Sequence, residues 1–278
     1  MLIAGIAFAG MNVSVKFLNH IPLFEIILVR VLITLILSYR TLKIRKINPW
    51  GNNKKFLILR GFFGGCGLIC YFYTLQNMEI ANAIVIHYLS PIFTTVIAIF
   101  VFSERVKFIQ WISFGISFLG VIAVKGFAKV ETMDFIVGIL GALFTGLAYN
   151  AIKNMKNKEE SDVIIFYHPL VTLPLTIVYF LMFPQPLVMP NLFELLLLVA
   201  TGICTQIGQY FITRAYQIED AAKISSVTYV GIIWGVLIGK FMFNDHYSAS
   251  VLLGMFLVIG GVLLNLNYQK VLNFFKNS

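Results

Sequence analysis

Long stretches of this 278-residue chain carry no charged side chain, and they constrain the fold more than any other feature. Eight stretches lack Asp, Glu, Lys and Arg: residues 61–78, 80–103, 108–124, 135–152, 163–193, 195–213, 224–239 and 246–269. Two further apolar segments, 2–19 and 22–40, each have one cation in their interior, Lys16 and Arg30, and the second also contains Glu25 and ends at Arg40. A helix needs about 20 mainly apolar residues to cross the hydrocarbon core of a membrane. The pattern therefore predicts an all-α membrane protein with ten transmembrane helices.

The composition supports the same class of protein. Hydrophobic residues make up 59% of the chain and charged residues 12%, against about 45–50% and about 25% in an average soluble domain. These proportions exclude a soluble enzyme and a disordered chain. The formal net charge of +9 does not indicate nucleic-acid binding, because basic residues in a membrane protein report which side of the membrane a loop faces. We expect membrane lipid as a partner, and no nucleic acid.

The basic residues are concentrated in alternate connections between the predicted helices. One set of loops and the C-terminal tail hold Arg40, Lys43, Arg45, Lys46, Lys54, Lys55, Arg105, Lys107, Lys153, Lys156, Lys158, Lys223, Lys270 and Lys276. The opposite set of loops holds only Lys125 and Lys129. Because cytoplasmic loops carry an excess of Lys and Arg, both termini are predicted to be cytoplasmic. A polybasic patch at residues 41–55 that binds anionic lipid is compatible with this orientation.

The second half of the chain repeats the first at an offset close to 138 residues. Residues 25–35 lie over residues 163–173, which places Arg30 on His168. We therefore predict two five-helix repeats, residues 1–127 and residues 133–270. Because five is odd, the second repeat enters from the opposite side of the bilayer. Such inverted repeats are typical of secondary transporters that work by alternating access.

Several motifs recur in both halves of the chain. In the first half, residues 73–83 read YTLQNMEIANA, residues 89–93 read LSPIF, and residues 102–105 read FSER. The second half repeats part of this pattern as RAYQ at residues 214–217 and as paired glycines in the last helix. These motifs resemble the EamA family of the drug/metabolite transporter superfamily.

This resemblance covers nearly the whole chain, and it implies a ten-helix, five-plus-five inverted fold that moves a small metabolite through a central cavity. The family handles amino acids, nucleosides, cofactors and xenobiotics, so the resemblance names no single metabolite. We expect a multi-pass location in a bacterial inner membrane. The chain departs from the pattern at Gly231, which replaces the first half's Pro91, and at Asn244-Asp245, which replace a Gly-Glu pair.

Ionisable side chains in the middle of predicted spans are the first candidates for a binding site, because a charge buried in the membrane is costly unless it faces a cavity or a partner. Arg30 lies eight residues past Pro22, about 12 Å into its helix, which is too deep for snorkelling. Its planar guanidinium favours a carboxylate or a phosphate on the substrate. His87 and His168 lie near prolines, where they either satisfy freed carbonyls or contact substrate. Lys16 lies nearer the outer face, where snorkelling and pairing are equally reasonable.

A polar stripe runs along the predicted helix at residues 195–213, where glutamine, tyrosine and threonine recur at three- and four-residue steps. Such a stripe faces water or a packed neighbour and not lipid. We expect a small-molecule substrate to bind in a cavity lined by Arg30, His168, Asn12, Tyr71, His87, Tyr88, Gln206, Gln209, Tyr210, Thr213, Tyr229 and Trp234.

Glycines at four-residue spacing predict close helix packing. Gly61 and Gly65 form one such pair, and Gly231, Gly235 and Gly239 form a longer series. Glycine at this spacing lets two helix backbones approach closely, where van der Waals contact replaces the missing hydrophobic driving force.

Other kinds of chemistry are less well supported by the sequence. The four histidines, His20, His87, His168 and His246, lack metal-ligand spacing, and the sequence has no nucleotide-binding motif. We expect no metal, no cofactor and no enzyme activity. A membrane-embedded enzyme that uses the buried His and Arg side chains stays an alternative, although an enzyme needs a clustered acid/base or metal set. A channel is a third option, but the sequence offers no filter-like loop.

Overall fold

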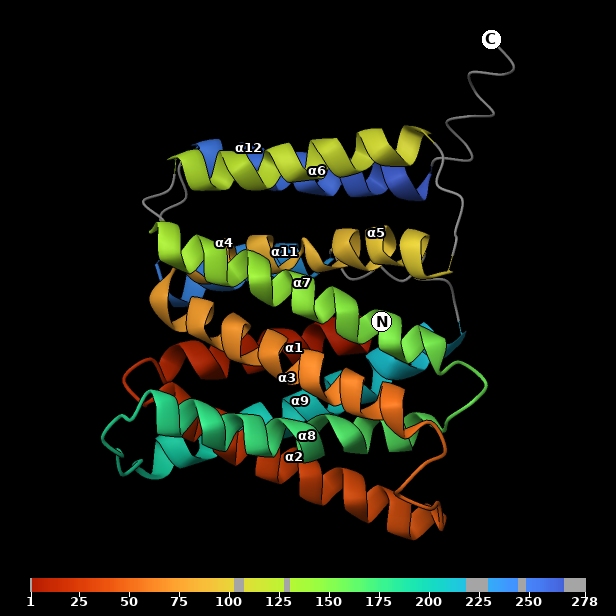
Figure 1. Cartoon of the computed structure of the whole chain (residues 1–278). Coiled ribbons are helices and arrows are strands. Elements are labelled where there is room, and N and C mark those ends of the chain that lie inside the picture. The colour runs from red at the N-terminus through yellow and green to blue at the C-terminus, as the bar shows by residue number, and fades with distance from the viewer. Residues whose placement is uncertain (1, 103–107, 128–130, 219–229, 245–248, 268–278) are drawn as a thin grey trace.

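The computed structural model describes residues 2–102, 108–127, 131–218, 230–244 and 249–267, and its regular elements within these ranges are all α-helices. They are α1 (Leu2–Phe17), α2 (Leu23–Arg45), α3 (Lys54–Asn77), α4 (Ile80–His87), α5 (Ser90–Phe102), α6 (Phe108–Phe127), α7 (Thr132–Asn154), α8 (Ser161–Met182), α9 (Leu192–Ile218), α11 (Val230–Met242) and α12 (Ala249–Leu266). The helices lie side by side in one layered bundle (Figure 1). The all-helical prediction is confirmed for the described part of the chain.

Five segments of the described structure are helical, long and apolar enough to cross a membrane. They are Lys54–Asn77, Asn82–Val101, Thr132–Asn154, Ser161–Met182 and Leu192–Ile218. α1 and the apolar stretches within α6 and α12 are shorter. The total of ten spans and the cytoplasmic position of both termini stay predictions.

Breaks between the helices fall where the sequence places its helix-ending residues. Pro22 immediately precedes α2, and Lys46 ends it in the left-handed conformation with φ of 55°. α3 begins directly after Asn53, and the Glu159 carboxylate accepts hydrogen bonds from the backbone N–H groups of Asn52 and Asn53. The start of α3 is therefore held by the loop before α8, which joins two ends that are distant in sequence.

The helix packing pairs the two halves of the chain with each other. α3 packs against α7 and α8, while α9 packs against α1 and α2. α6 and α12 form a separate pair along one side of the bundle (Figure 1). The largest buried apolar cluster draws on both halves and includes Val15, Ile27, Phe72 and Leu198. The centre of the bundle therefore lies between the halves.

The predicted membrane helix at residues 80–103 is interrupted. α4 ends at His87 and α5 begins at Ser90, with Pro91 in the first turn of α5. The predicted span itself is supported, since Asn82–Val101 is one of the five candidate spans, but a turn at Tyr88 and Leu89 divides its helix in two. Proline has no N–H to donate, and its ring collides with the carbonyl four residues earlier. For Pro91 that carbonyl belongs to His87, where α4 ends.

Gly61 and Gly65 lie where α3 meets α8, as their spacing predicts. A Cβ atom at Gly61 would lie 2.7 Å from the backbone oxygen of Tyr167, and one at Gly65 would lie 2.9 Å from Thr172 Oγ1. These distances are too short for any side chain. The corresponding contacts of Gly231 and Gly235 lie outside what the structure describes.

Replacing Gly61 by leucine should therefore force α3 and α8 apart. We expect Gly61→Leu to lower the free energy of unfolding by about 1–3 kcal/mol, the usual cost of overpacking. Gly115→Leu is the matched control, because a Cβ atom at Gly115 meets nothing within 4 Å. Thermal denaturation in detergent checks both variants, and equal melting temperatures would contradict the close contact at Gly61.

Candidate functional site

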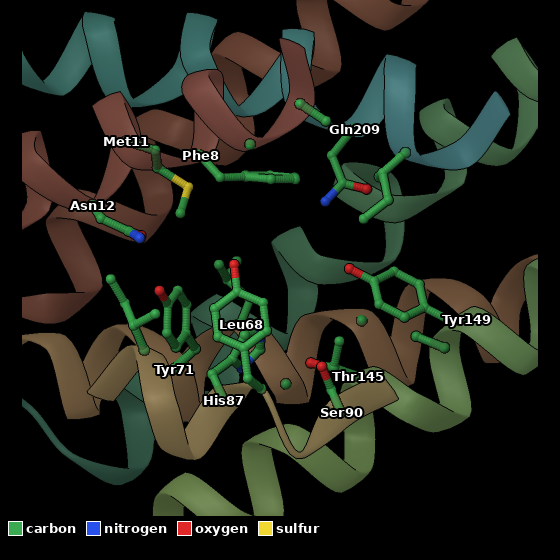
Figure 2. Close-up of a pocket in the computed structure, with 18 of the residues that line it drawn as sticks. Phe8, Met11, Asn12, Leu68, Tyr71, His87, Ser90, Thr145, Tyr149 and Gln209 are labelled. Carbon is green, nitrogen blue, oxygen red and sulfur yellow. The ribbon is translucent and has the colours of Figure 1, made fainter. Parts of the chain in front are cut away.

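A cavity occupies the centre of the bundle and contains about 1160 Å³ of space that no atom fills, part of it open to the outside. Its lining residues come from α1, α2, α3, α4, α5, α7, α8, α9 and α11. Both halves of the chain therefore contribute to one shared space. Figure 2 shows labelled side chains from α1, α3, α4, α5, α7 and α9 turned toward it.

One end of the cavity is aromatic. The rings of Tyr71 and His87 are stacked with their centroids 4.1 Å apart. Asn12 and Met11 of α1 lie across from them, and Phe8 reaches over the middle of the space (Figure 2). This end offers flat apolar surfaces with a few polar atoms.

The other end of the cavity is more polar. Gln209 of α9 and Tyr149 of α7 lie at this end, with Thr145 and Ser90 nearby (Figure 2). Gln209 Oε1 accepts a hydrogen bond of 2.8 Å from a terminal nitrogen of Arg60. The guanidinium of Arg60 therefore belongs to the polar end.

Arg30 is buried in the wall of the cavity, with 2% of its surface exposed. Its Nε donates a hydrogen bond of 2.9 Å to Thr205 Oγ1 of α9. The guanidinium carbon lies 5.4 Å from the centroid of the Phe72 ring, a distance at which a cation and an aromatic ring attract. α9 and α3 together hold Arg30 in place.

His168 and Arg60 meet above Gly64. A Cβ atom at Gly64 would lie 2.1 Å from Arg60 Nη1 and 3.1 Å from His168 Nε2. Only glycine at position 64 leaves room for the Arg60 guanidinium to lie this close to the α3 backbone. Arg30 and Arg60 are close enough to repel each other electrostatically, and both act on His168.

Several buried polar atoms of the cavity-lining residues have no hydrogen-bond partner within the described protein. They are Asn12 Oδ1, Arg30 Nη1, Arg60 Nε and His87 Nδ1. A buried polar group without a partner costs about 1–3 kcal/mol, and more when it is charged. Such groups are rare in native proteins unless a functional reason keeps them. Their concentration here makes the cavity the candidate binding site of the described structure.

The structure brings seven of the twelve predicted site residues to this cavity: Arg30, His168, Asn12, Tyr71, His87, Tyr88 and Gln209. Thr213 is buried elsewhere, with its hydroxyl unpartnered. Trp234 is 39% exposed and is absent from the cavity wall. Tyr229 lies outside the described residues.

Gln206 and Tyr210 face a different depression, which Ser38, Thr41 and Asp162 also line. The expectation that the α9 stripe faces the cavity as a unit is therefore wrong. A step of three residues turns a helix by about 300°, so Gln209 points about 60° away from Gln206. That rotation is enough to separate the two glutamines.

Arg60 is the main residue that sequence reasoning missed. It directly precedes the charge-free run that starts at residue 61, the position of a cation that flanks a span. α3 in fact begins at Lys54, which puts Arg60 six residues inside the helix. The usable signal was Asn53, since asparagine is a preferred residue immediately before a helix.

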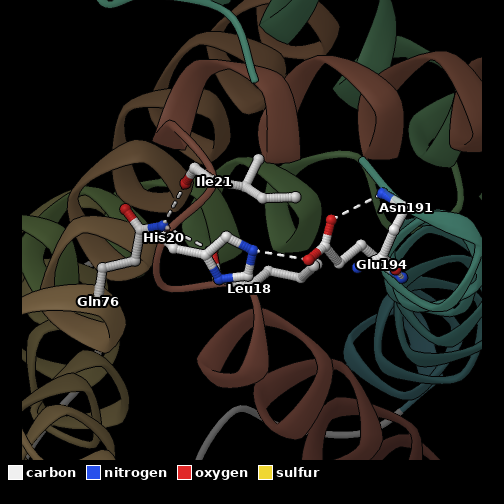
Figure 3. A network of polar contacts seen from close by, with 6 residues as sticks. All are labelled: Leu18, His20, Ile21, Gln76, Asn191 and Glu194. Carbon is white, nitrogen blue, oxygen red and sulfur yellow. Dashed lines mark hydrogen bonds and ion pairs between the residues drawn. The ribbon is translucent and has the colours of Figure 1, made fainter. Parts of the chain in front are cut away.

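Polar contacts close the bundle around the turn between α1 and α2. His20 Nε2 lies 2.9 Å from Glu194 Oε1 of α9, and Gln76 of α3 donates a hydrogen bond of 3.0 Å to the carbonyl of Ile21 (Figure 3). Lys16 donates a hydrogen bond of 2.6 Å to the carbonyl of Met78, so it pairs with the end of α3. These contacts tie α1, α3 and α9 together at this end of the bundle.

Different contacts join the helices at the opposite end. Arg45 Nη1 lies 2.8 Å from Asp162 Oδ2. Tyr167 donates a hydrogen bond of 2.9 Å to the carbonyl of Trp50, and Gln217 donates one of 2.9 Å to the carbonyl of Glu159. Polar contacts therefore join helices of both halves of the chain at each end of the bundle.

Comparison of the whole sequence with known protein families identifies the family of this chain. The EamA-like transporter family matches residues 1–125 and again residues 133–267. The chain belongs to the EamA-like transporter family. It is therefore a multi-pass integral membrane protein of a transporter family.

Individual EamA-like relatives carry different names. The chain is 27% identical over 265 residues to the pseudopaline exporter CntI of Pseudomonas aeruginosa, covering 93% of this chain and 91% of that protein. It is 25% identical over 276 residues to an uncharacterized transporter of Helicobacter pylori, covering 95% and 92%. It is 24% identical over 221 residues to an S-adenosylmethionine uptake transporter of Rickettsia prowazekii, covering 77% and 72%.

A solved crystal structure shares the fold of this EamA-like chain. The TM-score is 0.72 at 17% sequence identity, and the match covers 97% of this chain and 98% of the other. The arrangement of helices around the cavity is thus one that a known protein adopts.

The hydrogen bond between Arg30 and Thr205 supplies a test of the cavity wall. Thr205→Val should lower the free energy of unfolding by about 1–3 kcal/mol, because it leaves a second nitrogen of a buried guanidinium without a partner. Thr201→Val is the matched control, since Thr201 is equally buried and its hydroxyl only donates to the carbonyl of Leu197 in the same helix. Chemical or thermal denaturation in detergent compares them. Equal losses for the two variants would remove Thr205 as the support of Arg30.

Proposed function

We propose that this EamA-like protein is a secondary transporter that moves a small metabolite through its central cavity by alternating access. The observation that carries the proposal is the cavity itself. It lies between the two halves of the chain and gathers unpartnered polar atoms of Asn12, Arg30, Arg60 and His87. In transporters, substrates bind near the middle of the membrane where two repeats meet.

The repeat pattern supports alternating access. The family matches the chain twice, over two segments of similar length. The packing has a matching symmetry, since α3 contacts α7 and α8 in the way that α9 contacts α1 and α2. Two five-helix repeats, residues 1–127 and residues 133–270, of opposite orientation account for both observations. Rocking of one repeat against the other would expose the cavity to each side in turn.

The broken span formed by α4 and α5 also favours transport. Tyr88, Ser90 and Pro91, at or beside the break, line the cavity. Non-helical backbone at membrane depth is tolerated only where it is buried in protein or lines a cavity. Discontinuous helices of this kind typically form the substrate sites of secondary transporters.

The distribution of charge supports an orientation with both termini in the cytoplasm. Figure 1 places the N-terminal end of α1 on the side of the bundle where α2 meets α3 and α7 meets α8. Those connections and the helix ends beside them hold the basic residues Lys43, Arg45, Lys46, Lys54, Lys55, Lys153, Lys156 and Lys158. We assign this end to the cytoplasmic side of a bacterial inner membrane.

The named relatives include both an exporter and an uptake transporter. For this chain we propose a small polar or amphipathic metabolite as cargo, because the cavity has an aromatic end and a polar end. We also propose that the protein has ten membrane spans, one of which is formed by α4 and α5 together.

Transport can be tested by filling the cavity. In proteoliposomes, a panel of radiolabelled amino acids, nucleosides and cofactors should include at least one compound that enters saturably. Gly5→Trp should abolish this entry, because Gly5 lines the cavity and a Cβ atom there meets nothing within 4 Å. The indole therefore has room to fold into the space and block it.

Gly115→Trp is the matched control for this experiment. It adds the same side chain on α6, where a Cβ atom also meets nothing within 4 Å, but outside the cavity wall. We expect this variant to transport normally. If Gly5→Trp folds and transports as fast as the wild type, the cavity is not the substrate path.

A further inference from the structure

Two buried arginines line the cavity, and each has one buried guanidinium nitrogen without a hydrogen-bond partner in the described protein. Arg30 and Arg60 are both 2% exposed. Arg30 Nη1 and Arg60 Nε have no hydrogen-bond partner within the described protein. The partners that the two guanidiniums do have, Thr205 Oγ1 and Gln209 Oε1, are uncharged. The hydrogen bonds orient both groups without neutralising either.

Acidic side chains do not supply the missing charge within the described part of the cavity wall, whose lining residues include neither Asp nor Glu. The described acidic residues lie instead at the beginnings of helices or just before them: Glu25, Glu79, Glu131, Asp134, Glu159, Glu160, Asp162 and Glu194. There they complement the positive ends of the helix dipoles. The centre of the bundle keeps two positive charges and no described counter-charge.

This arrangement is costly in the empty protein. A charge removed from water needs a partner of opposite sign, and here two like charges also repel each other. Each arginine is only 2% exposed, so water that enters the cavity relieves little of that cost. The fold nevertheless maintains the arrangement, since Gly64 makes room for Arg60 and Thr205 fixes Arg30.

We infer that the cavity binds an organic anion, with the carboxylate or phosphate group of the transported solute held between Arg30 and Arg60. Guanidinium groups bind these planar or tetrahedral anions through paired charge-assisted hydrogen bonds. An anion between the two guanidiniums would accept hydrogen bonds from them and would screen the repulsion between the two charges. The assignment rests on the proposed transport function and specifies its substrate class.

The rest of the cavity fits the body of such a solute. From Gln209, which marks the Arg60 end, the space runs past Phe8 to the stacked rings of Tyr71 and His87 (Figure 2). These flat surfaces suit an aromatic or otherwise apolar group on the same molecule. A small anion with a ring therefore matches both ends of the cavity.

The test uses two probes of the same size that differ in charge. Phenylacetate should raise the melting temperature of the full chain in detergent, and the neutral phenylacetamide should not. Arg30→Gln and Arg60→Gln should each weaken phenylacetate binding about tenfold or more, since each removes a charge-assisted hydrogen bond. Without ligand, both variants should melt at higher temperature than the wild type, because one uncompensated charge is gone.

Three further variants separate binding from folding. Arg45→Gln is the control, since Arg45 pairs with Asp162 at the edge of the bundle, and it should keep the full response to phenylacetate. Arg60→Lys retains the charge but not the fork of donors, and Gly64→Ala pushes Arg60 Nη1 from its place. Arg60→Lys and Gly64→Ala should both fold and bind phenylacetate more weakly than the wild type. They test the site even if the Arg60→Gln protein does not fold.

Several outcomes would overturn the assignment. One is an equal response to phenylacetate and phenylacetamide, and another is an unchanged response in both Arg30→Gln and Arg60→Lys. Stabilisation by inorganic phosphate or short-chain phosphatidylglycerol, with none by phenylacetate, would assign the arginines to a free ion or a lipid headgroup and contradict a solute site.

Uptake distinguishes a failure of this assignment from a failure of the proposed function. Entry of a neutral or cationic metabolite that Gly5→Trp blocks, without any binding of anions, would overturn the anion site and leave transport intact. Arginine-dependent binding of phenylacetate without entry of any metabolite would support the anion site and contradict transport.

Discussion

The hydrocarbon core of a membrane offers no hydrogen-bond partners, and this constraint organises the whole molecule. Backbone groups must be satisfied within helices, and irregular backbone survives only beside protein or a cavity. The break between α4 and α5, at Tyr88 and Leu89, follows this rule, since Tyr88 and the neighbouring Ser90 line the central cavity. The same constraint explains why Arg30, Arg60 and His168 gather there, because lipid-facing positions would leave them without partners.

The charged side chains are divided between the ends and the centre of the bundle in a way that costs stability. The described carboxylates lie at helix starts near the ends of the bundle, while two guanidiniums lie at its centre. A protein selected for stability alone would replace one arginine or place an acid beside it. Strained or underpaired groups of this kind are characteristic of functional sites, where stability and activity oppose each other. Gly64 is needed for the same arrangement, since any side chain there would displace Arg60.

The sequence predicts the helical class and much of the site, but rotation and helix boundaries limit it. Depth alone identifies Arg30 and His168, because an ionisable group far from a span's end needs a cavity or partner. The depth of Arg60 cannot be deduced in this way, since Arg60 borders a charge-free run. Only the start of α3 at Lys54 places Arg60 well inside the helix. Gln206 and Gln209 point in different directions around α9 and line different depressions, although their three-residue spacing suggests a shared face. Which helices surround the cavity depends on tertiary packing that no single segment encodes.

Access to the cavity from both sides of the membrane is the central claim, and cysteine labelling tests it most directly. The free cysteines Cys66, Cys70 and Cys204 would be replaced, and Thr145→Cys would place one thiol on the cavity wall. A membrane-impermeant maleimide should label this thiol in both right-side-out and inside-out vesicles, and Gly5→Trp should suppress the labelling. Gly115→Cys should stay unlabelled from either side. Labelling of the Thr145→Cys protein from only one side would contradict alternating access and make the cavity a pocket on one face.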